Sequence, residues 1–316
     1  MRVLALLLCT ACAGAAAQDK FPSRPITLVS PFQPGGSTDV IPRAVAPVIS
    51  ESLRTAVLVE NRPGATGAIG AAHVARAKPD GHTLLVVSTP VVAINQWVYK
   101  SLPYNPETDF IPVITVATAP NLLAVHPGVP VSNLAELIAL AKAKPLSFAS
   151  AGHGSPQHLC GELLKVAAGI DLVHVPYKGA APAQQDVVAG QVPLICSSLS
   201  VTLAQVRAGR LRAIALATKN RHPQVPDIPT AHEAGLPGFE FDVWFGLVAP
   251  AATPSAIVDR LNVEFGRALR TPAVAAQLQG LGLTIVADSP REFAALIAAE
   301  SAKWRRIVER AGVKAE

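Results

Sequence analysis

The sequence predicts an α/β fold divided into two lobes, and three observations support this. Short β-branched runs alternate with amphipathic helical patterns along most of the chain. The predicted strands are almost wholly apolar, as expected for parallel sheets that are covered on both faces. Half of the 316 residues are hydrophobic and only 5% are aromatic, so a large core must be built mainly from Ala, Val, Leu and Ile. A chain of this length favours about two domains.

The N-terminal segment has the layout of a secretory signal peptide and is left out of the fold. Arg2 precedes an apolar run from Val3 to Cys12, and small residues follow up to Ala17. The run is too short to cross a bilayer, so we expect residues 1–17 to be a signal peptide cleaved near Ala17. A lipoprotein signal is the less favoured alternative, because Cys9 stands where an apolar residue is needed. No later run reaches about 18 apolar residues, so the mature chain is expected to be exported and soluble.

Ten apolar runs are predicted to be strands. In chain order they are residues 26–32, 56–61, 82–89, 110–118, 122–126, 146–151, 171–177, 192–198, 211–218 and 245–250. Amphipathic patterns predict helices over residues 131–145, 155–169, 253–269 and 289–312. In the first of these, Ser132 is the expected N-cap and Pro145 the expected stop.

The chain has no low-complexity linker, so the lobe boundary is expected at strands that cross between lobes. The segments near 120–130 and 241–254 each carry an apolar strand into a proline-rich turn. We therefore predict one lobe from residues 21–123 plus 248–316 and the other from residues 124–247. A ligand would then sit in the cleft between them.

Charge and cysteine content exclude several classes. The formal net charge is +5 at pH 7, but the cations are scattered, whereas a nucleic-acid-binding protein should gather them on one face with aromatic platforms. No Cys/His spacing indicates a metal site. Outside the signal segment only Cys160 and Cys196 remain. Export permits a disulfide, but both lie in apolar stretches, so two buried thiols are slightly favoured.

Glycines 64, 67 and 70 follow an apolar strand, as in a dinucleotide-binding loop. Asn61-Arg62-Pro63 separates them from the strand, whereas such a loop runs directly from strand to helix. The strand over 82–89 also ends without the carboxylate that would bind a ribose. We interpret the segment as a tight turn followed by a helix that Gly70 allows to pack closely, and we expect no cofactor.

The turn after the first strand is a candidate anion site. Gln33-Pro34-Gly35-Gly36 forms the turn, and Ser37 or Thr38 is expected to cap a helix that starts near Asp39. Two glycines let the backbone approach a ligand, and helix N-terminal N–H groups favour negative charge. An ordinary capped turn is the alternative.

A second turn repeats this chemistry. Gly152-His153-Gly154-Ser155 follows a strand and leads into a helix with Pro156 at its first position and His158 in its first turn. Two helix N-termini, one in each lobe, could then face one small anion. A Ser155–His158 hydrolase pair is the rival interpretation, but proline after the serine removes a useful N–H. For His158 alone, a structural role is also open.

Polar residues end two other strands, where open α/β sheets bind ligands. Tyr177 and Lys178 follow one strand, and Ser88 and Thr89 end another. For each of these alone, a structural role is equally consistent.

Taken together, these segments resemble the Bug-type periplasmic solute-binding proteins of the tripartite tricarboxylate transporter system. The matching stretches include "FPSRPITLVSPFQPGGSTD", "VLVENRPGATGAIGA", "ASAGHGSPQHLCGEL" and "VPYKGAAPA", and they run in order over residues 21–316. The resemblance implies a two-lobed type II periplasmic binding fold (a Venus flytrap) with mainly parallel sheets and two crossing strands as the hinge. It also identifies the glycine-rich turn as structural.

The resemblance further implies a monomeric, non-enzymatic periplasmic receptor that passes a carboxylate-bearing solute to membrane permease subunits. A receptor that feeds a sensor kinase is the alternative. The implied ligand-binding residues are Gly35, Gly36, Ser37, Thr38, Asp39, Ser88, Thr89, Ser150, Ala151, Ser155, His158, Tyr177 and Ser197. No metal and no cofactor are implied.

One departure bears on the ligand. Where relatives usually read roughly "DLMFDN", this chain reads "PLICSS" from Pro193 to Ser198, so that Ser197 replaces an acid. If that acid neutralises an ammonium group in amino-acid-binding relatives, its loss disfavours amino acids here. We expect a mono- or dicarboxylate without an amine, with aromatic acids among the candidates.

Overall fold

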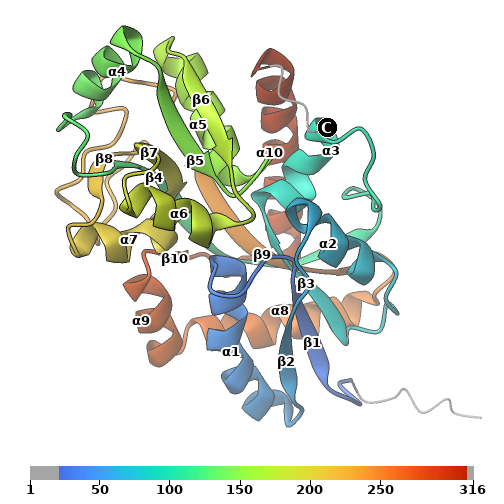
Figure 1. Ribbon diagram of the computed structural model, residues 1–316. Helices are drawn as coiled ribbons and strands as arrows, with labels where there is room; N and C mark the ends of the chain where they lie inside the picture. Colours follow the sequence, from blue (N-terminus) through green and yellow to red (C-terminus); the bar gives the residue numbers. More distant parts are fainter. Residues whose placement is uncertain (1–20, 312–316) are drawn as a thin grey trace, which may run out of the picture.

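The computed structural model describes residues 21–311, and the predicted signal peptide lies outside this range. Its strands form a continuous sheet with the order β2-β1-β3-β9-β4-β7-β5-β6, while β10 and β8 also pair with β4 (Figure 1). The strands are β1 (Ile26–Ser30), β2 (Val57–Asn61), β3 (Thr83–Ser88), β4 (Phe110–Val125), β5 (Leu146–Ser150), β6 (Leu172–Pro176), β7 (Leu194–Ser198), β8 (Arg212–Leu216), β9 (Asp242–Pro250) and β10 (Thr284–Ile285).

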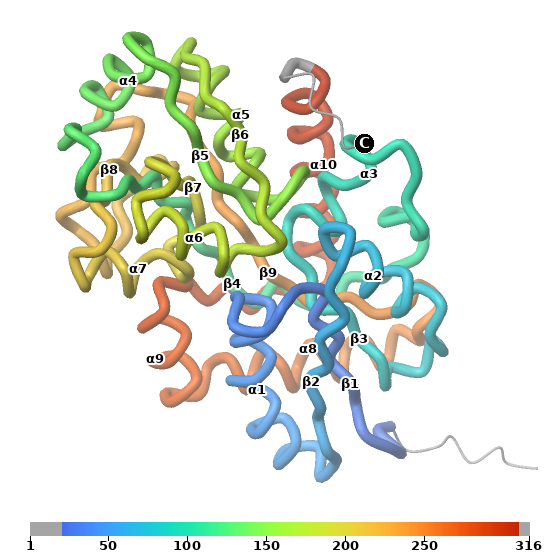
Figure 2. The backbone as a smooth tube through the Cα atoms, in the orientation of Figure 1, coloured from blue at the N-terminus to red at the C-terminus, as the bar shows by residue number. Residues whose placement is uncertain are grey.

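Strand β4 runs through both portions of the sheet. Its 16 residues were expected as two separate strands. As far as Pro120 it pairs with β9, and from Asn121 onward it pairs with β7 and β8. Figure 2 traces the strand from one half of the molecule to the other. The pairing partner of β4 therefore changes from β9 to β7 and β8 between Pro120 and Asn121.

The pairing is parallel in the outer parts of the sheet and antiparallel in the middle. β2-β1-β3 and β6-β5-β7 are parallel groups. β9 is antiparallel to β3 and β4, and β4 is antiparallel to β7 and β8. Strand–helix–strand units give parallel neighbours, whereas β4 and β9 return directly from the other portion and so pair in the opposite sense.

Helices cover both portions of the sheet. They are α1 (Ser37–Leu53), α2 (Ala68–Ala75), α3 (Asn95–Val98), α4 (Leu134–Ala143), α5 (Pro156–Ala168), α6 (Ala180–Val188), α7 (Leu199–Arg207), α8 (Ser255–Leu269), α9 (Pro272–Gly280) and α10 (Pro290–Ala311). Short helical turns lie at Ala65–Gly67 and Pro90–Ile94. No helix within residues 21–311 combines the length and the apolar character needed to cross a membrane.

Close packing of α10 on β9 supports the core. Trp304 on α10 is fully buried and packs on Phe241, with ring centroids 4.4 Å apart. A Cβ atom at Gly246 would lie 2.3 Å from the ring of Phe293, so only glycine lets the helix approach the strand this closely.

Two helix starts differ from the sequence prediction. α1 begins at Ser37 with Gly36 as its N-cap, so no side chain caps it. α4 is capped by Asn133, not Ser132: Asn133 Oδ1 accepts from the Glu136 N–H at 2.9 Å, and Glu136 Oε2 accepts from the Ser132 N–H at 2.6 Å. This is a variant of the capping box, in which Glu136 at the third helical position accepts from the backbone N–H of the residue before the N-cap.

Cys160 and Cys196 form a disulfide, which corrects the preference for two thiols. Cys160 lies on α5 and Cys196 on β7, with Cα atoms 5.8 Å apart, within the normal range for a disulfide. Apolar surroundings therefore did not indicate free thiols here. The bond connects the helix that follows the second candidate loop to the strand that ends at Ser197 and Ser198.

Candidate functional site

The first candidate loop is held by Asp39. The Gly35 N–H, in a residue with φ of +90°, donates to Asp39 Oδ2 at 3.0 Å, and Arg43 Nε donates to Asp39 Oδ1 at 2.9 Å. Burial alone would raise the pKa of Asp39, but the hydrogen bonds from Arg43 and Gly35 outweigh burial and lower the pKa below its ordinary value. Both carboxylate oxygens of Asp39 are thus engaged in holding the loop in place.

The first turn of α1 has backbone donors available. Within residues 21–311, no hydrogen bond involves the backbone N–H of Ser37 or Thr38. Their hydroxyls are engaged: Thr38 Oγ1 accepts from Ser30 Oγ at 3.2 Å, and Ser37 Oγ lies 2.8 Å from Ser200 Oγ at the start of α7. The amides, together with the helix dipole, are the groups able to bind an anion here.

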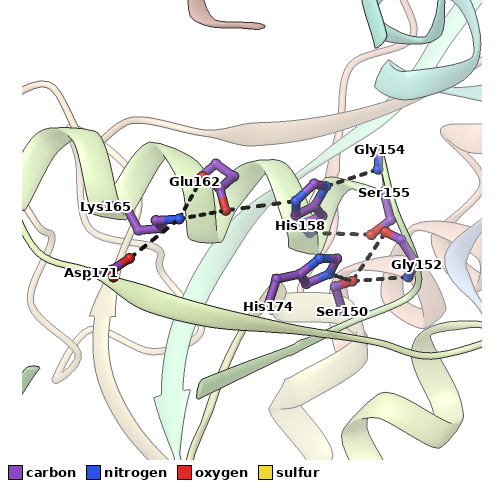
Figure 3. Close-up of polar contacts among 9 residues, drawn as sticks. All are labelled: Ser150, Gly152, Gly154, Ser155, His158, Glu162, Lys165, Asp171 and His174. Carbon is purple, nitrogen blue, oxygen red and sulfur yellow. Dashed lines mark hydrogen bonds and ion pairs between the residues drawn. The ribbon is translucent and has the colours of Figure 1, made fainter. Parts of the chain in front are cut away.

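The second candidate loop is held by hydroxyl and imidazole groups, as Figure 3 shows. The Gly152 N–H donates to Ser150 Oγ at 3.0 Å, and the Gly154 N–H donates to His158 Nδ1 at 3.0 Å. Ser155 is the N-cap of α5, and its Oγ accepts from the backbone N–H of His158 at 3.3 Å. The amides of the two loop glycines, at φ values of +119° and +71°, are therefore already satisfied.

Other amides in this loop remain available. Within the described residues, no hydrogen bond involves the backbone N–H of Ala151, His153 or Gln157. The donors that the second loop offers are therefore backbone N–H groups of residues near its glycines, and not the N–H groups of the glycines themselves. The Ser155–His158 hydrolase interpretation loses support, because Ser155 Oγ bonds the backbone of His158 and the imidazole Nδ1 is occupied by Gly154.

Three histidines gather beside this loop, and the sequence singled out only one of them. The rings of His158 and His174 stack with centroids 3.9 Å apart and planes 14° apart, and His153 meets both edge-on. His174 Nε2 hydrogen-bonds to Ser150 Oγ. Burial, together with the neighbouring His174, His153 and Lys165, lowers the pKa of His158 to about 3. Burial, with His153 and Lys165, lowers the pKa of His174 to about 4. Both rings are therefore neutral near pH 7.

These histidines are the metal-ligand candidates among the described residues. Their donor atoms lie within 4.8 Å of one another. The lone pairs of two nearly parallel rings lie in separate planes and do not converge on one point, and His158 Nδ1 and His174 Nε2 already bond the loop. A shared metal ion would require ring rotation and the loss of loop hydrogen bonds, so we interpret the cluster as a support for the loop.

The remaining predicted residues lie at the ends of their strands. Ser88 and Thr89 are buried, and Thr89 Oγ1 accepts from the Trp244 N–H of β9 at 3.2 Å. The Tyr177 hydroxyl donates to Asp186 on α6 at 2.7 Å, and burial with the Asp186 carboxylate raises the pKa of Tyr177 to about 12. The side-chain hydroxyls of Thr89 and Tyr177 thus have protein partners.

Ser197 is linked to the second loop by a residue that sequence reasoning missed. Gln157, in the first turn of α5, donates from Nε2 to Ser197 Oγ at 3.2 Å, and both residues are buried. Gln157 Oε1 is also buried and has no partner within the described residues. A polar residue directly before His158 in the first turn of a helix was the available signal.

The glycine-rich segment after β2 has the structural role predicted for it. Gly64 and Gly67 have positive φ, and a Cβ atom at Gly70 would lie 2.9 Å from the Cα atom of Pro31. This segment therefore packs α2 directly against Pro31, which lies between β1 and the first candidate loop.

Most of the chain matches one receptor family. A family model described as "Tripartite tricarboxylate transporter family receptor" covers residues 41–313. A "UPF0065 protein in tcbD-tcbE intergenic region" from Pseudomonas sp. strain P51 is 41% identical over 96% of this chain and 91% of its own length. Protein BugT from Bordetella pertussis is 35% identical over 99% of this chain and 98% of its own length.

Solved structures support the same assignment. An adipate-bound protein of R. palustris superimposes with a TM-score of 0.89 at 36% identity, covering 93% of this chain and 99% of the other. MatC from Rhodopseudomonas palustris with bound malate has a TM-score of 0.85 at 36% identity, covering 91% of this chain and all of the other. The periplasmic binding protein BugD has a TM-score of 0.86 at 34% identity, covering 94% of this chain and all of the other. This chain belongs to the receptor family of the tripartite tricarboxylate transporters.

Proposed function

We propose that this protein is a periplasmic receptor that binds a small carboxylate-bearing solute between two lobes and delivers it to a membrane permease. The lobes are residues 21–123 plus 248–316 and residues 124–247. The observation that carries the proposal is the pair of helix N-termini, α1 and α5, whose first turns keep backbone N–H groups without protein partners. Cleavage near Ala17 would release the chain into the periplasm.

Anion binding follows from the donors that are left over. The amides of Ser37 and Thr38 belong to one lobe, and those of Ala151, His153 and Gln157 belong to the other. Each charge-assisted hydrogen bond contributes about 1.5–3 kcal/mol. A few of them can give the roughly −8 kcal/mol of a micromolar complex once ordering costs are subtracted. Because the donors lie on both lobes, bound solute would favour the closed arrangement.

The ligand is expected to be a carboxylate without an amine. The charge of Asp39 is balanced by Arg43, and Ser197 stands where amino-acid-binding relatives are expected to carry an acid. An ammonium group would then find no free carboxylate at position 39 or position 197. Two of the structural relatives hold adipate and malate, which are dicarboxylates without an amine. The other residues proposed to line the site are Gly35, Gly36, Ser88, Thr89, Ser150, Ser155, His158 and Tyr177.

Binding is tested on the mature chain with adipate, malate, succinate, benzoate, aspartate and glutamate. We expect calorimetry to rank the acids without an amine above aspartate and glutamate. Native mass spectrometry of the protein as purified should reveal a retained small acid. A ranking led by aspartate or glutamate would overturn the expected ligand class, and no binding of any small acid would overturn the receptor proposal.

Delivery to a permease is tested separately. The purified liganded receptor should capture the membrane subunits of a tripartite transporter from detergent-solubilised membranes, and the unliganded receptor should capture less. Capture of a sensor kinase in their place would replace transport by signalling as the output.

A further inference from the structure

A strained turn in the glycine-rich segment touches the second candidate loop. Ala65 and Thr66 have φ values of +45° and +49°, a left-handed conformation that is uncommon for alanine and unfavourable for a β-branched residue. Glycine would adopt it without strain. Two such residues in succession persist only when the surrounding structure imposes the conformation.

Neighbouring elements of the same lobe hold the turn in place. Buried Asn95 donates from Nδ2 to the Thr66 carbonyl at 3.2 Å and to the Tyr104 hydroxyl at 3.2 Å. A Cβ atom at Gly67 would contact Val91 and Phe32. The turn is therefore fixed between Phe32, which directly precedes the first candidate loop, and the segment that follows β3.

The fixed turn presents a hydroxyl to the other lobe. Thr66 Oγ1 lies 2.6 Å from the hydroxyl oxygen of Tyr99, and the two hydroxyls lie 3.1 and 3.2 Å from the carbonyl oxygen of His153. Gly154 also lies close to the lobe that contains Thr66, since a Cβ atom at Gly154 would lie 3.3 Å from Val98 and 3.5 Å from Tyr99. We call Thr66 and Tyr99 the hydroxyl clasp.

The protons of the clasp can be counted. Two hydroxyl protons serve three short contacts, so one hydroxyl donates to the other and the second donates to the His153 carbonyl. Either hydroxyl can therefore take over the bond to the carbonyl if the other is lost. Only the loss of both leaves the carbonyl without a donor from this lobe.

The His153–Gly154 peptide is consequently held from both lobes. Its carbonyl accepts from the clasp, and its N–H donates to the neutral His158 Nδ1 at 3.0 Å. Hydrogen bonds in such a chain polarise one another and become stronger together. The same peptide lies next to the free N–H of His153, one of the donors proposed for the ligand.

We propose that Thr66 and Tyr99 are positioning residues that hold the ligand loop of the opposite lobe when the two lobes meet. This inference rests on the proposed function, because it assigns the clasp to ligand-dependent closure. The strained Thr66 backbone would be retained because it aims the hydroxyl across the cleft. The clasp would lengthen the lifetime of the liganded state without touching the solute.

The experiment compares adipate and malate binding in Thr66→Ala, Tyr99→Phe and the double variant, by calorimetry and stopped-flow release. We expect about a twofold weakening for each single variant, because the remaining hydroxyl replaces the lost one. The double variant should weaken binding about tenfold, more than the product of the singles, mainly through faster dissociation. Thr66→Ser, which keeps the hydroxyl, is the control and should bind like the native protein.

A second pair of variants separates positioning from ordinary stability. Thr66→Gly removes both the strain and the hydroxyl, so its unliganded melting temperature should equal or exceed that of the native protein while adipate and malate bind more weakly. Ala65→Gly relieves similar strain without removing a hydroxyl and should leave affinity unchanged. Native-like binding by Thr66→Gly and by the double variant would overturn the proposal.

Failure of the proposed function can be told apart from failure of the clasp. If the native protein binds neither acid, the proposed ligand class is wrong for those acids, and the clasp is tested without ligand. Deuterium exchange of peptides covering residues 151–158 should then be faster in the double variant than in Ala65→Gly. Equal exchange in the two proteins would overturn the clasp.

Discussion

The two candidate loops are held by the same pattern of hydrogen bonding, but with chemically different side chains. In each, a glycine with positive φ donates its N–H to the side chain four residues later: Gly35 to Asp39 and Gly154 to His158. The first acceptor is a carboxylate paired with Arg43, and the second is a neutral imidazole stacked on His174. Both arrangements use up the glycine N–H, and within residues 21–311 neighbouring amides have no hydrogen-bond partner. The donors that we propose for the anion are therefore the amides that the side chains do not occupy.

Removal of the disulfide should have the largest effect on the free energy of unfolding. It concerns the second loop alone, because only that loop is followed by a covalently anchored helix. Replacing Cys160 and Cys196 by alanine removes a bond across a separation of 36 residues, and we expect a loss of about 3–4 kcal/mol in the free energy of unfolding. Urea denaturation of the oxidised protein and the double variant measures it. A loss below about 1 kcal/mol would mean that noncovalent packing already fixes α5 on β7.

Asp39→Ala should show how much the first loop depends on its carboxylate. The substitution removes the acceptor for Gly35 and the partner of Arg43, and we expect a loss of about 2–3 kcal/mol in unfolding free energy with weaker acid binding. Asp39→Asn keeps an acceptor oxygen and should lose less. Equal losses for the two variants would show that charge, and not the hydrogen bond to Gly35, holds the loop.

Lowering the pH from 7 to 5 should reduce stability through His158 in the second loop and not through Asp39 in the first. The pKa of His158 is about 3 in the folded chain and about 6.5 when unfolded, so the unfolded state takes up protons first and stability falls as the pH drops. We expect His158 to account for about 2 kcal/mol of lost stability at pH 5. The lowered pKa of Asp39 affects stability only at lower pH, because its carboxylate is ionised in both states above about pH 5. His158→Gln should flatten the decline; an unchanged slope would contradict the assignment.

Gly36→Leu should have the smallest effect on stability and a large one on binding. Gly36 has a negative φ, and the nearest atom to an added Cβ atom is the Gln33 carbonyl oxygen at 4.0 Å. We expect a change of about 0.5 kcal/mol or less in unfolding free energy. The bulky side chain would block the amides of Ser37 and Thr38, so the thermal shift with adipate or malate should disappear. Gly36→Ala is the size control and should retain most of that shift.

The sequence was sufficient to predict most strands and the glycine-containing turns that lead into α1 and α5, because apolar runs and glycine–proline turns are local signals. Strand β4 was expected in two pieces, since Pro120 interrupts the apolar pattern without interrupting the pairing. Two-residue β10 has no pattern long enough to recognise.

The side-chain partners within the site depended on contacts between distant segments. His174 lies 24 positions from its partner Ser150, and Gln157 lies 40 positions from Ser197, so neither pair has a local signature. The disulfide was disfavoured by its apolar surroundings, although those surroundings are what a covered sheet provides on both faces. The four-residue spacing of Gly35 and Asp39, and of Gly154 and His158, is the local signal that was readable and was not used.

The side-by-side course of β4 and β9 between the two portions of the sheet has a consequence for motion. A ribbon of two hydrogen-bonded strands twists readily about its own length but resists sliding of one strand past the other. We therefore expect the receptor to open by torsion about this ribbon. Fluorescent probes near Pro120 and Asp242 should then report almost no change in separation, while probes on α2 and α4, far from the axis, should report the full swing.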